Sequence, residues 1–187
     1  GGSATNDAGL GMLQALGFRF LDKSGHTLGT GGQIMEAVAN IDTSGIHPAL
    51  RETHFMVACD VANPFYGPVG AAYIFAQQKG ADSNMVQRLD EGMQSLAEVI
   101  KKTTGKDITN YPGAGAAGGM GGGLLAFFNA ELKPGTELLL KAIDFSEKIK
   151  GADLIITGEG KADRQTAMGK VPYRILKEAQ KAGKITA

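Results

Sequence analysis

The sequence predicts an α/β fold, and three observations support this prediction. Short apolar runs typical of strands alternate along the chain with segments whose apolar residues recur at helical spacing. The 28 glycines among 187 residues, about twice the usual share of roughly 7%, cluster in loops beside these segments. The apolar residues 154–156 lead directly into a polar loop, as strands do at the carboxyl edge of an open α/β sheet.

The first part of the chain is expected to alternate between helices and strands. Apolar residues at three- and four-residue spacing predict helices over residues 5–16, 33–40, 71–78 and 82–102. Thr5 or Asn6 is expected to cap the first of them. Strands are predicted over residues 18–21 and 53–59. In the last helix, we expect the stripe Met85, Leu89 and Met93 to face the core.

The second part begins with the glycine-rich run 113–123, which passes into the apolar residues 124–128. Beyond it, the pattern predicts a helix over 134–143, a helical turn over 145–149, a strand over 153–157 and a helix over 172–182. A further strand is expected to start at Lys184. Because the chain has no initiating Met and stops inside this strand, we expect it to be an internal piece of a longer protein.

Charge and composition restrict the classes of partner. The 19 Lys and Arg residues equal the 19 Asp and Glu residues, so no overall field favours nucleic acid or an anionic membrane. No apolar run approaches the ~20 residues of a membrane span. Cys59 is the only cysteine, which excludes an internal disulfide and fits a reducing compartment. We therefore expect a cytoplasmic protein, with Cys59 packed in its core.

The loop after residue 157 concentrates groups suited to chemistry. Its glycines and polar groups include Gly158, Glu159, Gly160, Asp163, Arg164, Gln165, Thr166 and Lys170. Carboxylates suit a metal ion, and glycine amides beside a lysine suit phosphate. The loop is not a Walker A motif, because Arg164 stands where that motif has its first glycine. Alternatively, Asp163 and Thr166 cap turns and Lys170 is merely solvated.

The string Gly113-Ala-Gly115-Ala-Ala-Gly118 matches the G-x-G-x-x-G pattern of dinucleotide-binding sites. Its context is poor, since residues 108–112 do not form a convincing strand and no βαβ unit follows clearly. The glycines then serve either close backbone packing or a pocket of amides for phosphate or another anion. The sequence leaves both interpretations open.

The opening residues form a second glycine-led entry into a helix. Free amides and the positive helix end would hold an anion there, while Ser3, Thr5 and Asn6 can hydrogen-bond a ligand. Capping accounts for one of these residues but hardly for all of them.

Asp60 follows an expected strand and precedes a turn rich in Pro and Gly. It is either a catalytic or metal-binding carboxylate or an Asp that stabilises the turn.

Longer stretches of the sequence resemble the type-1 glycerate kinase family of bacteria. They occur in the family's order and read GGSATNDAGLGMLQALGFRFLD, ACDVANPFYGPVGAAYIFAQQKGA, PGAGAAGGMGGGLLAF and ADLIITGEGKADRQTAMGKVP. Together they cover most of the chain. The family usually has a second Gly after Asn-Asp, where this chain has Ala8.

The resemblance implies ATP-dependent phosphorylation of D-glycerate at its 2- or 3-hydroxyl, with Mg²⁺, and is compatible with a homodimer. It also implies two α/β domains, one Rossmann-like and the other inserted into it, with the active site between them. Residues 1–134 would form most of the inserted domain, and residues 135–187 part of the Rossmann-like domain. Because family members extend beyond both ends, we expect this chain alone to be inactive.

The density of polar groups beside glycines motivates the roles expected of single residues in this reaction. Glu159 and Asp163 would hold Mg²⁺ or orient the glycerate hydroxyl, and Asp163 and Asp60 are the candidate catalytic carboxylates. Candidate substrate- or nucleotide-binding residues are Ser3, Thr5, Asn6, Lys79, Gly113, Gly115, Gly118, Gly158, Gly160, Arg164, Gln165, Thr166 and Lys170. Among these, Lys170 would neutralise phosphate oxygens, and Arg164 or Lys79 would meet the glycerate carboxylate.

Two alternatives come from other functional classes. One is a non-catalytic α/β domain for ligand binding or assembly, in which the glycines serve packing only. The other is an NAD-linked oxidoreductase, which rests on the G-x-G-x-x-G string alone.

Overall fold

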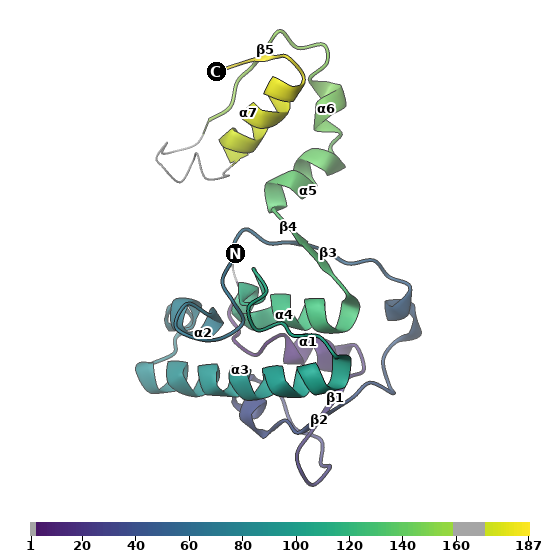
Figure 1. Ribbon diagram of the computed structural model, residues 1–187, viewed down its shortest axis with the longest axis vertical. Coiled ribbons are helices and arrows are strands. Elements are labelled where there is room, and N and C mark those ends of the chain that lie inside the picture. Colours follow the sequence, from purple (N-terminus) through teal and green to yellow (C-terminus); the bar gives the residue numbers. More distant parts are fainter. Residues whose placement is uncertain (1–2, 159–170) are drawn as a thin grey trace. The chain divides into compact units, whose positions relative to one another are not determined.

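A computed structural model describes residues 3–158 and 171–187 (Figure 1). The chain divides into two compact units, Gly1–Leu132 and Lys133–Ala187. This division lies close to the boundary expected at residue 134. Both units contain helices and strands, so the predicted α/β class is confirmed. The assignment of the units to an inserted and a Rossmann-like domain stays a prediction.

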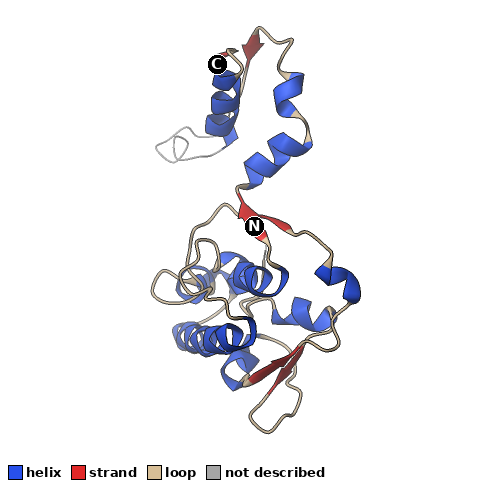
Figure 2. Ribbon diagram, turned by 45° about the vertical axis from the view of Figure 1, so that its right-hand side comes forward, coloured by secondary structure: helices blue, strands red, loops and turns tan. Residues whose placement is uncertain are grey.

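The first unit is built mainly of helices with short strand pairs. Its elements are α1 (Leu10–Ala15), β1 (Arg19–Leu21), η1 (Gly32–Ala37), β2 (Asn40–Asp42), η2 (Pro48–Arg51), β3 (Met56–Ala58), α2 (Ala71–Phe75), η3 (Gln77–Lys79), α3 (Ser83–Thr104), α4 (Ala116–Phe128) and β4 (Glu131–Lys133). Strands β1 and β2 pair antiparallel, and β3 pairs with β4. Figure 2 shows these strands as short red arrows beside the blue helices. The strands β2 and β4 were missed by the sequence patterns.

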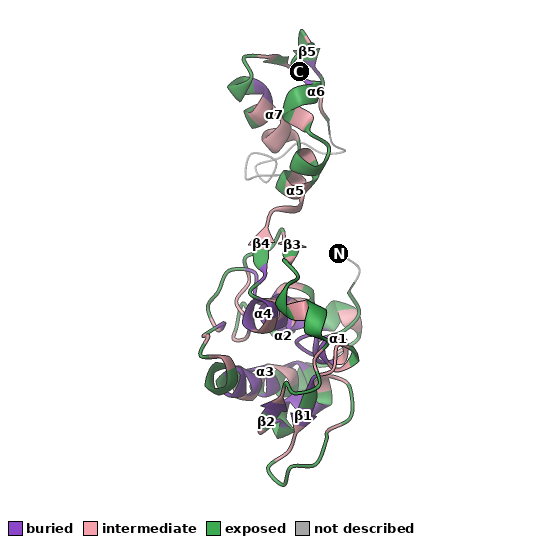
Figure 3. Cartoon of the chain, turned by 90° about the vertical axis from the view of Figure 1, so that its right-hand side faces the viewer, coloured by how far each residue is buried: buried purple, intermediate pink, exposed green. Residues whose placement is uncertain are grey.

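Helix α3 forms one side of the core of the first unit, as its periodicity predicts. The Asp82 carboxylate caps the helix by accepting from the amide of Met85, and the helix ends at Gly105 in a left-handed conformation. Met93, Leu96 and Ile100 are buried against side chains from α1, β1 and η1, and the buried residues of Figure 3 follow this side of the helix. The expected core stripe is wrong at its first member, because Met85 is 51% exposed. It lies in the first turn of the helix.

Helix α4 contains the glycine-rich run, and its backbone lies close to neighbouring segments. Residues 117–119 adopt left-handed backbone angles, after which the helix is regular. A Cβ atom on Gly118 would lie 2.1 Å from the carbonyl oxygen of Thr5, and one on Gly115 would lie 2.2 Å from that of Pro64. Such distances are far below van der Waals contact. The glycines therefore allow backbone to pack directly on backbone, which is one of the two interpretations left open by the sequence.

The first helix begins later than predicted. Residues 4–6 are not helical, and α1 starts at Leu10 after Gly9, so neither Thr5 nor Asn6 caps it. The carboxylate of Asp7 caps the start of this helix instead.

Cys59 is also less buried than expected, since its thiol is only partly covered and donates to the carbonyl oxygen of Val61 at 3.2 Å.

The second unit contains α5 (Gly135–Ala142), α6 (Phe145–Lys148), β5 (Leu154–Ile155), α7 (Val171–Lys181) and β6 (Ile185–Thr186). These elements lie within the ranges predicted from the sequence, apart from the first residue of α7. Strands β5 and β6 pair in parallel, and Ile149, Ile155 and Ala179 form a small core. Among the described residues, every helix is too short or too polar to cross a membrane.

Asp90 on α3 offers a test of stability against pH. Its carboxylate accepts a hydrogen bond from the amide of Gly67 at 2.8 Å, but burial raises its pKa. A raised pKa in the folded state means that Asp90 favours folding at low pH and loses this contribution as the pH rises through that pKa. Asp90→Asn keeps the acceptor and removes the charge, so we expect a small rise in melting temperature at pH 7 that disappears in acid.

Asp107 provides the control, because its pKa is shifted in the direction opposite to that of Asp90. A hydrogen bond from Lys101 lowers its pKa to about 2. Its stabilising contribution is present at neutral pH and is lost as the pH falls from its ordinary value toward about 2. Asp107→Asn should therefore slightly lower the melting temperature at pH 7, again without effect in acid. Equal responses of the two variants across the pH range would contradict both assignments.

Candidate functional site

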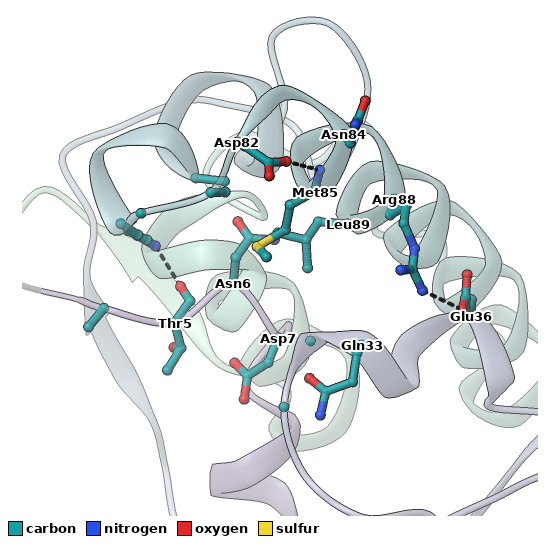
Figure 4. Close-up of a pocket in the computed structure, with 17 residues that line it drawn as sticks. Thr5, Asn6, Asp7, Gln33, Glu36, Asp82, Asn84, Met85, Arg88 and Leu89 are labelled. Carbon is teal, nitrogen blue, oxygen red and sulfur yellow. Dashed lines mark hydrogen bonds and ion pairs between the residues drawn. The ribbon is translucent and has the colours of Figure 1, made fainter.

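The first unit contains a pocket of about 510 Å³ beside the N-terminal end of α3. Its walls come from three segments that are distant in sequence: residues 4–7, residues 31–36 at the start of η1, and residues 76–89 from the end of α2 into α3. Figure 4 shows their side chains around the opening. We call this hollow the Asn6 pocket, after the residue at its floor.

Asp7 fixes the loop that supplies the first wall. Its buried carboxylate accepts hydrogen bonds from the amides of Gly9 at 3.1 Å and Gly11 at 3.2 Å. Gly9 directly precedes α1 and Gly11 lies in its first turn, where amides have no partner within the helix and a carboxylate satisfies them well. The next residue, Ala8, has a φ of 56°, and its amide donates to the carbonyl oxygen of Gly118 at 2.9 Å. The glycine-rich part of α4 is thus hydrogen-bonded to the end of this loop.

Asn6 is buried at the floor of the pocket, with 9% of its surface exposed. Its amide nitrogen lies 3.4 Å from the sulfur of Met93, which is a weak acceptor. Its side-chain oxygen Oδ1 is buried and has no hydrogen-bond partner. A buried acceptor without a donor costs about 1–3 kcal/mol, so this carboxamide is better suited to a ligand than to the protein around it.

Lys79 closes the pocket on a second side. Its ammonium group donates to the carbonyl oxygen of Thr5 at 2.6 Å, across 74 residues of sequence. Burial lowers the pKa of Lys79, and the charge of Asp7 acts in the opposite direction. The lysine therefore joins the end of η3 to the loop of residues 4–7.

The first turns of α3 form the remaining wall. The Asp82 carboxylate accepts from the amide of Met85 at 2.8 Å, while the side chains of Met85 and Leu89 line the pocket. Further along the helix, the guanidinium of Arg88 lies 3.2 Å from a carboxylate oxygen of Glu36 on η1. This wall is apolar near the pocket floor and charged at its edge.

The structure brings together Thr5, Asn6 and Lys79 among the residues predicted from the sequence. Ser3 is exposed next to this loop but does not line the pocket. Asp60 is exposed after β3 and lies outside the pocket lining as well. These positions do not test the predicted role of either residue.

The predicted glycine positions fall into separate places. Gly113, Gly115 and Gly118 are buried in contacts within the first unit, and none of them lines the Asn6 pocket. Gly158 is exposed in the second unit, after β5. The remaining predicted site residues lie outside the described residues: Glu159, Gly160, Asp163, Arg164, Gln165, Thr166 and Lys170.

The described part of the chain offers no group of three or more His, Cys, Asp or Glu side chains that could hold a metal ion. The proposed ligands of Mg²⁺, Glu159 and Asp163, are not among these residues. The carboxylate nearest the pocket floor, Asp7, is occupied by two backbone amides. The described residues therefore assign no metal site.

Sequence reasoning missed several residues of the pocket, including Asp7, Gln33, Met85 and Arg88. The sequence around Asp7 does contain a pattern from which its role could be predicted. Asp7 stands two residues before Gly9 and four before Gly11, a spacing at which a carboxylate can cap the start of a helix. The other three become visible only when η1 and α3 lie side by side.

Comparison with known proteins matches the chain over its full length. The family model described as "Glycerate kinase family" matches residues 1–187. A protein named glycerate kinase from Halalkalibacterium halodurans is 47% identical over 98% of this chain and 48% of its own length. A glycerate 2-kinase from Escherichia coli is 48% identical over 97% of this chain and 48% of its own length. The chain thus spans about half the length of these curated relatives.

A solved structure gives the same result in three dimensions. The crystal structure of a putative glycerate kinase 2 from Salmonella typhimurium LT2 matches with a TM-score of 0.91 and 44% sequence identity. The match covers 100% of this chain and 50% of that one.

Proposed function

The chain belongs to the glycerate kinase family, and from this premise we propose that the whole protein phosphorylates D-glycerate with ATP. The observation that carries the proposal is the family match along the entire chain. The Asn6 pocket adds to it, because residues 4–7 and 76–81 of its lining belong to two of the stretches that resemble this family. The NAD hypothesis loses its support, since residues 108–112 before the glycine string form turns and not a strand.

The proposed chemistry requires positioning and charge neutralisation more than covalent participation by the protein. When bound, ATP supplies the phosphoryl group that is transferred. In the first unit, Thr5 and Asn6 offer hydrogen bonds and Lys79 holds their loop in place. The roles proposed for Glu159, Asp163 and Lys170 in holding Mg²⁺ and neutralising phosphate rest on the density of polar groups beside glycines in the sequence. The roles proposed for Asp60, Arg164, Gln165 and Thr166 have the same basis.

The product is proposed to be 2-phosphoglycerate. The Escherichia coli relative, at 48% identity, is named a glycerate 2-kinase, which favours the 2-hydroxyl over the 3-hydroxyl. We further propose that the enzyme acts in the cytoplasm, where ATP is available.

The activity is tested with the full-length protein and the 187-residue chain side by side. The full-length protein should consume ATP only when D-glycerate is present, with phosphate on the 2-hydroxyl by NMR of the product. The chain alone should show no turnover, because it spans about half of its relatives and the active site is proposed to lie between two domains. Full activity of the chain alone would contradict its dependence on the other half, and no glycerate-dependent turnover by the full-length protein would contradict the function.

A further inference from the structure

We propose that the Asn6 pocket binds the nucleoside part of ATP, with its base against Met85 and Leu89, and does not bind glycerate. This inference rests on the proposed function. It assigns one of the two substrates to a defined place in the first unit, and three properties of the pocket support it.

The first property is the combination of size and apolar surface. A volume of about 510 Å³ lies within the range of about 300–1,000 Å³ typical of sites for small organic ligands. Glycerate would leave most of this space empty. The walls near the floor are formed by Met85 and Leu89 together with Ala76 and Ala81. Apolar side chains of this kind suit the face of a planar base, whereas glycerate has no apolar face to cover.

The second property is the charge of the lining. The pocket is bordered by the carboxylates of Asp7, Glu36 and Asp82 and by the cations of Lys79 and Arg88. The charged groups of both signs already have partners, since Lys79 donates to Thr5, Arg88 pairs with Glu36, and Asp7 and Asp82 accept from backbone amides. With three carboxylates and two cations, the lining still has a net negative charge, which disfavours a small anion such as glycerate. A neutral nucleoside meets no such repulsion.

The third property is the unpartnered oxygen of Asn6. Oδ1 is buried and accepts no hydrogen bond, so a fitting ligand must bring a donor. Carboxylate and phosphate oxygens cannot donate when ionised. The exocyclic amino group of adenine can, and the amides of Gln33 and Asn84 at the pocket border can donate and accept at the other edges of a base.

The direct test is calorimetric titration of the full-length protein with adenosine, which carries no phosphate. Met85→Ala removes part of the apolar wall and should raise the dissociation constant for adenosine about tenfold. Met85 is half exposed, so the substitution should leave folding intact. The matched control is Met56→Ala, because Met56 is 53% exposed, against 51% for Met85, but lies outside the pocket lining. Adenosine binding should be unchanged in this variant.

Steady-state kinetics separate the two substrates. In Met85→Ala, we expect the KM for ATP to rise about tenfold while the KM for D-glycerate stays within twofold of the parent value. A rise in the glycerate KM alone would overturn the inference and leave the proposed kinase activity intact. Equal adenosine binding by the parent, Met85→Ala and Met56→Ala would overturn it as well. If the parent protein shows no glycerate-dependent turnover, the function fails, and the adenosine titration still decides the pocket's ligand.

Discussion

Replacing Gly118 with alanine is expected to lower the free energy of unfolding of the full-length protein by at least about 3 kcal/mol. Gly118 has a φ of +71°, in the left-handed region that disfavours a Cβ atom. That atom would also lie 2.1 Å from the carbonyl oxygen of Thr5 and 2.8 Å from the Cα of Asn6. Backbone atoms cannot move aside as a flexible side chain can, so the loop of the Asn6 pocket must shift.

Gly105 supplies a matched control for this substitution. Its φ of +74° is nearly the same, but a Cβ atom there would meet nothing within 4 Å. Gly105→Ala should therefore lower the free energy of unfolding only by the cost of placing a residue with a Cβ atom in the left-handed conformation, about 1–2 kcal/mol. Urea denaturation of both variants gives the steric contribution as the difference between them. Similar losses for the two variants would show that the contact with Thr5 is not tight.

The comparison also bears on the role of the glycine-rich run. If packing alone explains Gly118, its substitution should weaken adenosine binding only as far as it displaces Thr5 and Asn6. Gly115 has a φ of −77°, so Gly115→Ala should show the steric contribution alone, because its Cβ would lie 2.2 Å from the carbonyl oxygen of Pro64. The proposal that these glycines contact a nucleotide would instead predict binding losses that exceed the loss of stability.

Much of the fold follows from local patterns. Helix α3 has a capping Asp82, a stripe of apolar residues and a terminal Gly105, and the structure agrees with these signals. The helices and strands of the second unit also lie close to their predicted ranges. These features depend on neighbours in sequence, so the sequence alone is enough to predict them.

The parts that could not be predicted depend on contacts between distant segments. Strand β2 is only three residues long and is defined by its pairing with β1, so it has no pattern of its own. Met85 follows the helical stripe of α3, yet it is half exposed and lines the pocket. The glycine string matched a nucleotide motif because close backbone packing and phosphate binding both require residues without a Cβ.

Asp7→Ala is the second substitution with a large expected effect. The buried carboxylate accepts from the amides of Gly9 and Gly11, and its removal leaves both donors without a partner at the start of α1. Hydrogen bonds to a charged group contribute about 1.5–3 kcal/mol each. We expect the free energy of unfolding to fall by about 3 kcal/mol, and adenosine binding to weaken because Thr5 and Asn6 precede this turn.

Asp22→Ala is the control with the same hydrogen-bond pattern in an open setting. The Asp22 carboxylate accepts from the amides of Ser24 at 2.8 Å and His26 at 2.9 Å, but Ser24 and His26 are exposed to water. When the carboxylate is removed, water can satisfy these amides, so the loss of stability should be clearly smaller than in Asp7→Ala. An equal loss in the two variants would show that burial of Asp7 adds nothing to its contribution.

Asp7→Asn separates the charge of this residue from its size. Burial lowers the pKa of Lys79, and the negative charge of Asp7 partly opposes this shift. Without that charge, the pKa of Lys79 should fall further, which can be followed by NMR of labelled lysine in the full-length protein. The hydrogen bond from Lys79 to Thr5 requires only a donor and should persist. An unchanged lysine pKa would mean that Asp7 stabilises the pocket through its hydrogen bonds to α1 alone, and that its charge does not act on Lys79.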